Sequence, residues 1–134
     1  MPVKIVIDTN IWVSYFISAR TDYLIQWIAN NEVEVFTSAE LIEELENVLL
    51  RPKFKLPFPS NAFVELHKKV CTQIKINPRY IDAPDKDDNF LFDICLKAKA
   101  AFLITADKQL LQHKPSFLLE ITSFNEIRNK ISRL

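Results

Sequence analysis

Glycine is absent from the 134 residues of this chain, although an average usage of about 7% would give around nine glycines. A glycine-rich loop that cradles a phosphate is therefore excluded. Turns must depend on other residues, and we expect the Asn30-Asn31 pair, the Asn77-Pro78 pair and the proline-rich stretch Pro52–Pro59 to provide them.

Long apolar runs and a cysteine framework are also missing. No apolar run approaches the ~20 residues that span a bilayer, and Met1–Lys4 lead directly into the first predicted strand, which leaves no room for a signal segment. Cys71 and Cys95 lie in separate helical patterns without metal-ligand or redox spacing. We expect a cytoplasmic protein without a membrane segment, in which both thiols are buried and reduced.

A global excess of positive charge is missing too, because 17 basic residues balance 17 acidic ones. The charge of the whole chain therefore does not mark a nucleic-acid binder. A local basic segment remains, in which Arg51, Lys53 and Lys55 are interleaved with Phe54. This segment predicts a path for a phosphate backbone, although such side chains are as often only solvated. The next candidates for contacts with a phosphate backbone are Arg20 and Lys108.

Strand and helix patterns alternate along the chain, and its length fits one domain over residues 1–134. The predicted strands are Val3–Ile7, Val33–Thr37, Ala101–Thr105 and Leu118–Ile121, with a weak edge candidate at Ile76–Ile81. The predicted helices are Ile11–Ser18, Asp22–Ala29, Ala39–Leu50, Asn61–Ile74, Asp88–Lys99 and Phe124–Ile131. This order predicts an α/β fold, in which three α/β/α layers surround a central, mostly parallel sheet. Right-handed crossovers then place the carboxyl ends of the strands at one edge.

Acidic residues directly follow two of the predicted strands. Asp8 closes the apolar run Val3–Ile7, and Asp107 comes just after the run Ala101–Thr105. In an open parallel sheet, ligands bind outside the carboxyl ends of the strands, so the two acids together indicate a site at that edge.

The helix predicted after Ser38 can bring a glutamate to the same edge. Its buried stripe consists of Leu41, Ile42, Leu45, Val48 and Leu49. At 100° per residue, Glu40 and Glu43 point away from this stripe, whereas Glu44 and Glu46 border it. Glu44 is closer to the start of the helix and hence to the carboxyl edge of the sheet. We therefore assign Glu44 to the site.

A fourth acid comes from the helix predicted to begin at Asp88, which flanks the buried stripe of that helix in its first turn. Asp87 and Asp85 remain alternatives, because an aspartate before a helix is often only a cap. Asp93 projects away from the stripe, and we expect it to be a surface charge that pairs with Lys97.

Four converging carboxylates would repel one another unless a cation neutralised them. With all-oxygen ligands and neither histidine placed near the acids, the set suits Mg²⁺ or Mn²⁺ better than zinc. Such an ion orients a water and stabilises charge that develops on a phosphate, which is the chemistry of metal-dependent nucleases. No serine or cysteine nucleophile motif accompanies the histidines, so triad chemistry has little support.

Five segments in order resemble the PIN-domain ribonucleases, and in particular the PIN-family toxins of bacterial and archaeal toxin-antitoxin modules. The segments are Ile7–Val13, Ser38–Leu45, Val48–Phe54, Asp85–Leu91 and Leu103–Leu111. Each segment alone is a weak signal, but their order and spacing together are a strong one.

The resemblance implies a set of metal ligands and a set of supporting residues. The ligands are Asp8, Glu44, Asp88 and Asp107, and the supporting residues are Asn10, Ser38 and Thr105. Asp87 is kept as a further supporting candidate because of its place beside Asp88. It also implies Mg²⁺ or Mn²⁺, cleavage of single-stranded RNA, a homodimer and an antitoxin partner. Many relatives have glycine where this chain has Ala106, which predicts a stiffer loop before the last acid.

Two alternatives stand beside a metal-dependent endoribonuclease. A catalytically weak or inactive module of the same fold would keep the acidic pocket and act by binding RNA or a protein partner. A phosphoacceptor receiver domain fits less well, because it needs paired acids after its first strand, and here Thr9 and Asn10 follow Asp8.

Overall fold

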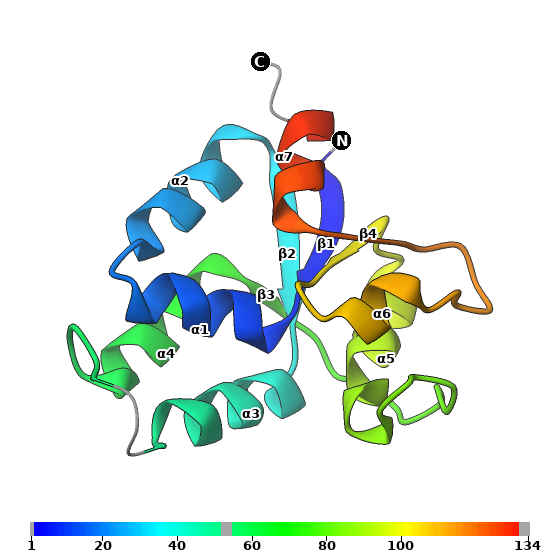
Figure 1. Ribbon diagram of the computed structural model, residues 1–134, viewed down its shortest axis with the longest axis horizontal. Helices are drawn as coiled ribbons and strands as arrows, with labels where there is room; N and C mark the ends of the chain where they lie inside the picture. Colours follow the sequence, from blue (N-terminus) through cyan, green and yellow to red (C-terminus); the bar gives the residue numbers. More distant parts are fainter. Residues whose placement is uncertain (1, 52–54, 132–134) are drawn as a thin grey trace.

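The computed structural model describes residues 2–51 and 55–131, which form a parallel sheet between two layers of helices (Figure 1). The strands are β1 Val3–Ile7, β2 Val33–Thr37, β3 Thr72–Gln73, β4 Phe102–Ile104 and β5 Glu120–Thr122. The helices are α1 Thr9–Ile17, α2 Thr21–Asn30, α3 Ala39–Leu49, α4 Ser60–Val70, α5 Asn89–Ala98, α6 Lys108–Gln112 and α7 Phe124–Ile131, and a short 3₁₀ turn, η1, spans Lys86–Asp88. The sheet order is β3-β2-β1-β4-β5, and every described strand pairing is parallel.

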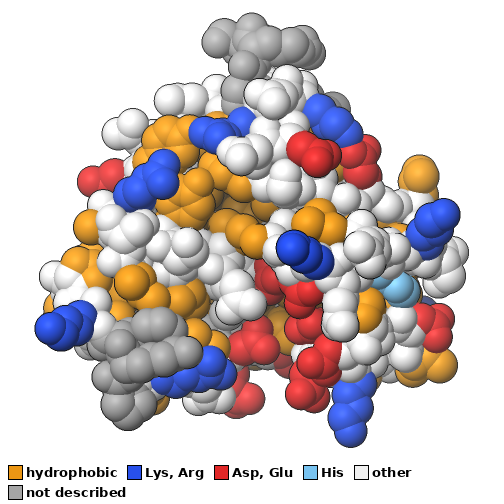
Figure 2. All heavy atoms as spheres, in the orientation of Figure 1, with side chains coloured by type: hydrophobic (Ala, Val, Ile, Leu, Met, Phe, Trp, Pro, Cys, Tyr) orange, Lys and Arg blue, Asp and Glu red, His pale blue; other side chains and the backbone are white. Residues whose placement is uncertain are grey.

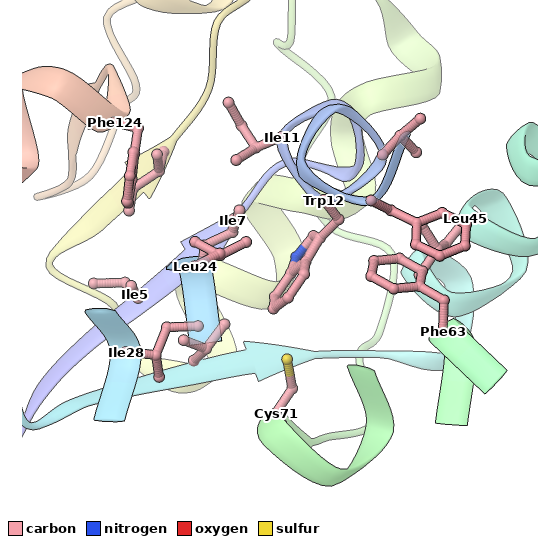
Figure 3. Packing of buried hydrophobic residues seen from close by; sticks show 14 of the residues in the cluster. Ile5, Ile7, Ile11, Trp12, Leu24, Ile28, Leu45, Phe63, Cys71 and Phe124 are labelled. Carbon is pink, nitrogen blue, oxygen red and sulfur yellow. The ribbon is translucent and has the colours of Figure 1, made fainter. Parts of the chain in front are cut away.

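The central strand β1 supplies apolar side chains to both faces of the sheet. Ile5 and Ile7 pack with Trp12 of α1 and Leu24 of α2 on one face, as Figure 3 shows. Val6 points to the other face, where it belongs to a second core. That core includes Leu91 and Phe92 of α5, Leu103 of β4 and Leu110 of α6. Successive side chains of a strand alternate between faces, so β1, which is apolar from Ile5 to Ile7, needs cover on both sides. The predicted three-layer α/β fold is confirmed.

The segment after α4 differs from the prediction. The helix ends at Val70 rather than Ile74, because Cys71 adopts an extended conformation with φ −102° and ψ 149°. The chain then pairs with the end of β2 as the two-residue strand β3, and Ile74 N–H donates to Thr37 C=O at 2.9 Å. The predicted edge strand Ile76–Ile81 is therefore wrong, which agrees with the inability of Pro78 to donate to a ladder.

Left-handed backbone occurs at residues that the sequence did not indicate. Ala19, Glu32 and Lys99 have φ of 58°, 52° and 56°, whereas Asn31, at the end of α2, keeps φ −113°. Ala19 and Lys99 each end a helix in a Schellman motif. In the first of these motifs, Arg20 N–H donates to Tyr15 C=O at 2.8 Å. A side chain with a Cβ thus occupies positions that glycine usually fills.

Both cysteines are free and buried. Among the described residues, no helix is long and apolar enough to cross a membrane.

Candidate functional site

Asp8 lies at the carboxyl end of β1, where the backbone passes into α1. Its side chain is only 4% exposed, and its carboxylate accepts a hydrogen bond from the Thr105 hydroxyl at 2.7 Å. The backbone N–H of Asp8 donates to Ile104 C=O at 2.9 Å, which continues the pairing of β1 with β4. The acid is thus held at the sheet edge by the neighbouring strand.

Asp107 follows β4 and caps the short helix α6. Its Oδ1 accepts from the backbone N–H groups of Gln109 at 2.8 Å and Leu110 at 3.4 Å. Its own N–H donates to the Thr105 hydroxyl oxygen at 3.1 Å. Thr105 therefore binds both acids, because the hydroxyl donates to Asp8 and accepts from Asp107.

Glu44 reaches the same edge from α3. Ser38 caps this helix, since its buried Oγ accepts from Leu41 N–H at 3.3 Å. Glu44 is partly buried, whereas Glu40 and Glu43 are exposed. Glu46, the other residue that borders the stripe, is also exposed. The structure therefore turns Glu44 inward and the other three glutamates of the helix towards solvent.

Asp88 lies where the η1 turn passes into α5, and it is partly buried. Burial, the largest cause, and repulsion by Asp8, Asp85, Glu44 and Asp107 together raise the pKa of Asp88 to about 7. The carboxylates that the sequence placed at one edge are thus close enough to repel one another.

The pKa of Asp8 is raised for the same kind of reason. Burial is the largest cause, and the charges of Glu44 and Asp107 add to it, while hydrogen bonds from the Thr105 hydroxyl and the Asn10 backbone N–H oppose it. Across residues 2–51 and 55–131, no three carboxylates, imidazoles or thiols stand in a ready-made metal cage. The four acids are therefore close enough to repel one another, but no three of them in the described residues are arranged to bind one metal ion.

The remaining predicted site residues take up varied positions. Thr105 and Ser38 are buried, Asn10 is exposed, and Asp87 is exposed with its N–H donated to the Asp85 carboxylate at 2.9 Å. Asp85 and Asp87 therefore form a local cap of the η1 turn.

The basic segment is described in part. Arg51 lines a shallow groove of about 390 Å³ together with Glu44, Asn47 and Phe90. Lys55 is exposed, and Lys53 lies outside the described residues. One cation of this segment is therefore next to the acidic edge.

The prediction for Asp93 is wrong. Its side chain is 5% exposed, and its Oδ1 accepts from the backbone N–H groups of Arg79 at 3.0 Å and Tyr80 at 2.9 Å. The helical pattern placed Asp93 off the buried stripe, but the segment before η1 folds back over that side of α5. The acid anchors a loop instead of pairing with Lys97 at the surface.

Sequence reasoning did not find the partners of the histidines. His67 Nε2 and Thr37 Oγ1 are 2.9 Å apart in the core, and burial lowers the pKa of His67 to about 4. His113 Nε2 and Tyr80 Oη are 2.6 Å apart on the other side of the sheet. For the contact between His67 and Thr37, the sequence gives one signal, namely that Thr37 is a polar residue at the end of a mostly apolar strand.

The sequence model of the PIN domain matches residues 4–109, a span that includes Asp8, Glu44, Asp88 and Asp107. The chain belongs to the PIN-domain family. An uncharacterised protein of Methanocaldococcus jannaschii is 26% identical over 115 residues, which cover 81% of this chain and 74% of that protein. PIN domains are generally nucleases, so membership directs attention to the acidic edge of the sheet.

Proposed function

We propose that this PIN domain is a metal-dependent endoribonuclease that cleaves single-stranded RNA, and that it acts in the cytoplasm as the toxin of a toxin-antitoxin pair. The observation that carries the proposal is the mutual repulsion of Asp8, Glu44, Asp88 and Asp107 at the carboxyl edge of the sheet. Uncompensated acids in one place destabilise a fold, and perturbed pKa values of this kind cluster at functional sites.

The donor set fits a hard divalent cation. Carboxylate oxygens are the ligands that Mg²⁺ and Mn²⁺ prefer, and both histidines are engaged elsewhere. Asp8, Asp88 and Asp107 would hold Mg²⁺ or Mn²⁺, with Glu44 beside them. When bound, the ion supplies the chemistry of water activation and of phosphate charge stabilisation.

The protein residues take distinct roles in this proposal. Thr105 orients Asp8 and the Asp107 backbone through one hydroxyl, and the Asn10 N–H supports the Asp8 carboxylate. Ser38 fixes the start of α3 and so the position of Glu44, which orients or deprotonates the attacking water. Arg51, which lines the Glu44 groove, binds the phosphate backbone together with Lys53 and Lys55 of the same basic segment.

A catalytically weak module that binds RNA or a protein partner is the second candidate. It is favoured by the absence of a ready-made metal cage among the described residues. Ala106 does not itself argue for it, since its φ is not among the positive values that would strain an alanine.

Cleavage assays with purified protein and single-stranded RNA test the proposal. We expect cleavage with Mg²⁺ or Mn²⁺, and none in excess chelator or in the Asp8→Asn protein. Equal cleavage in chelator would remove the metal mechanism, and persistent activity of Asp8→Asn would indicate a contaminating nuclease. Folded wild-type protein that cleaves under no condition would favour the binding module.

The toxin role and the homodimer need their own measurements. A short neighbouring reading frame whose product binds this chain and suppresses its cleavage would support the toxin assignment. Sedimentation of the purified chain at its working concentration would test the proposed homodimer, and a monomer would contradict it.

A further inference from the structure

A cluster of aromatic rings and arginines lies where α1, α2 and α7 meet; Arg20 and Tyr23 are its exposed members, and Phe124 is its buried base. We call it the α1–α7 platform, and it consists of Tyr15, Arg20, Tyr23, Phe124 and Arg128. The rings of Tyr15 and Tyr23 are stacked with centroids 6.2 Å apart and planes at 15°, and Phe124 packs edge-on against both. Tyr23 is 40% exposed, so one ring of the stack faces solvent.

Two guanidinium groups lie over these rings. The Arg20 guanidinium is 5.2 Å from the Tyr15 centroid and 5.4 Å from that of Tyr23, and the Arg128 guanidinium is 5.2 Å from that of Phe124. Burial raises the pKa of Tyr15, and the charges of Arg20 and Arg128 offset part of that rise. Both cations therefore converge on one aromatic surface.

Neither arginine is neutralised by an acid in the part of the chain that the structure describes. The ion pairs found there join Lys68 to Glu65 and Lys130 to Glu120. Arg128 Nη1 instead donates to Tyr23 Oη at 2.6 Å, and its Nη2 binds Asn125. The platform therefore presents positive charge that stays available to an anion.

The position of Arg20 is fixed by the backbone. The Schellman motif at the end of α1 places Ala19 in the left-handed region and bonds Arg20 N–H to Tyr15 C=O. Arg20 thus contacts Tyr15 twice: its backbone N–H binds the Tyr15 carbonyl, and its guanidinium lies over the Tyr15 ring. Such pre-organisation reduces the ordering cost of binding a ligand.

The platform and the acidic edge lie on one face of the molecule. Asp8 directly precedes α1, and Tyr15 comes seven residues later, which is roughly 10 Å along a helix at 1.5 Å per residue. Figure 2 shows the acidic side chains below the centre of this face, and an apolar surface edged by basic side chains above them, between α2 and α7 of Figure 1.

We propose that the α1–α7 platform binds a segment of the single-stranded RNA that extends from the acidic edge. Arg20 and Arg128 contact phosphates, and a base stacks on the exposed ring of Tyr23. Charge complementarity favours RNA as the occupant, since two arginines that make no ion pair with a described acid lie beside an exposed aromatic ring and match a phosphate backbone with unstacked bases. The inference rests on the proposed function for the identity of the strand, but binding can be measured without cleavage.

Binding of a labelled polyuridylate of about 20 nucleotides in excess chelator tests the platform. We expect Arg20→Gln to weaken binding about 3- to 10-fold at low salt and to reduce the slope of log K against log salt by about 0.7, the value for one lost phosphate contact. Lys69→Gln is the matched control, because Lys69 is an exposed cation of α4 without an ion pair in the described part of the chain. It should change affinity less than about twofold.

Tyr23 provides a second variant that keeps the charge constant. Tyr23→Leu should weaken binding about 5-fold through lost stacking, while Tyr23→Phe, which loses only the hydroxyl that Arg128 binds, should stay within about twofold. Thermal melts identify any variant that does not fold, and the other variant then decides. Wild-type affinity in both folded Arg20→Gln and Tyr23→Leu would overturn the platform.

The result is separable from the proposed function. Reduced binding by both variants of a protein that never cleaves RNA would support the platform while the nuclease proposal fails. Metal-dependent cleavage together with unchanged binding by both variants would overturn the platform while the nuclease proposal stands. Unchanged RNA binding with loss of a protein partner would assign the surface to protein and overturn it as well.

Discussion

Asp8 and Asp93 are buried almost equally, at 4% and 5% exposed, but their surroundings differ. Asp93 receives two backbone N–H groups on one oxygen, which compensate its burial and hold a loop against α5. Asp8 is also hydrogen-bonded, by Thr105, yet it faces the charges of Glu44 and Asp107. Burial alone therefore does not distinguish Asp8, a candidate site residue, from Asp93, whereas repulsion by other acids does.

The largest effect on stability should come from removing the compensated acid. Asp93→Ala leaves the N–H groups of Arg79 and Tyr80 without their acceptor, which should cost about 3 kcal/mol. Denaturant unfolding would measure the loss. Asp93→Asn keeps an acceptor oxygen and should lose less, so equal losses for the two variants would contradict the hydrogen-bonded role.

The comparison also separates neighbouring glutamates of α3. Glu44 is partly buried and repels Asp8, whereas Glu43 is exposed. We expect Glu44→Gln to reduce RNA cleavage about 10- to 100-fold and Glu43→Gln to leave it within about twofold. Initial rates with saturating Mg²⁺ would decide, and a reversed order would mean that the wrong face of the helix was assigned.

Repulsion between the acids predicts that the stability order of the wild type and Asp107→Asn differs between metal-free and Mg²⁺-bound protein. In chelator, Asp107→Asn should be more stable than the wild type by about 1 kcal/mol, because one charge leaves the cluster. Asparagine can still cap α6, so the hydrogen bonds to Gln109 and Leu110 do not confuse the comparison. Saturating Mg²⁺ should reverse the order by binding the folded wild type more tightly. Identical melting temperatures in chelator would mean that the acids do not interact.

A smaller effect should appear in the pH dependence of the metal-free protein. The pKa of Asp88 is raised to about 7 in the folded state and is about 3.9 when unfolded, so between these values the folded state binds more protons. Stability should therefore fall as the pH rises from about 4 to about 7. Because Asp88 is only half-buried, solvent screening limits the change to about 1 kcal/mol.

The Asp88→Asn protein isolates this contribution from other titrating groups. Its stability should depend less on pH across the same window. If unfolding measurements gave the two proteins parallel pH profiles, Asp88 would not carry the effect.

The sequence predicted the fold wherever an element had its own pattern. The bounds of β1 and β2 agree with the prediction, because both strands are mostly apolar and are followed by the polar residues Asp8 and Ser38. The two-residue β3 and the five-residue α6 were missed, since elements this short carry no period. Their formation depends on contacts, namely the pairing with Thr37 and the cap from Asp107.

The candidate site divides in the same way. Asp8 and Asp107 could be placed from sequence because parallel strands share a carboxyl edge. The bridge that Thr105 makes between them could not, because a hydroxyl that follows a strand has many local partners to choose from. Asp93 was misplaced because a helical wheel takes no account of a loop that folds back over the helix.

The left-handed residues at the ends of α1 and α5 show where the protein could be made more stable. Ala19 and Lys99 hold a conformation that costs a residue with a Cβ about 1 kcal/mol or more relative to glycine. Since the two helix ends belong to separate elements, the gains from Ala19→Gly and Lys99→Gly should add. Because this chain has no glycine at either helix end, the two substitutions together should raise its thermal stability.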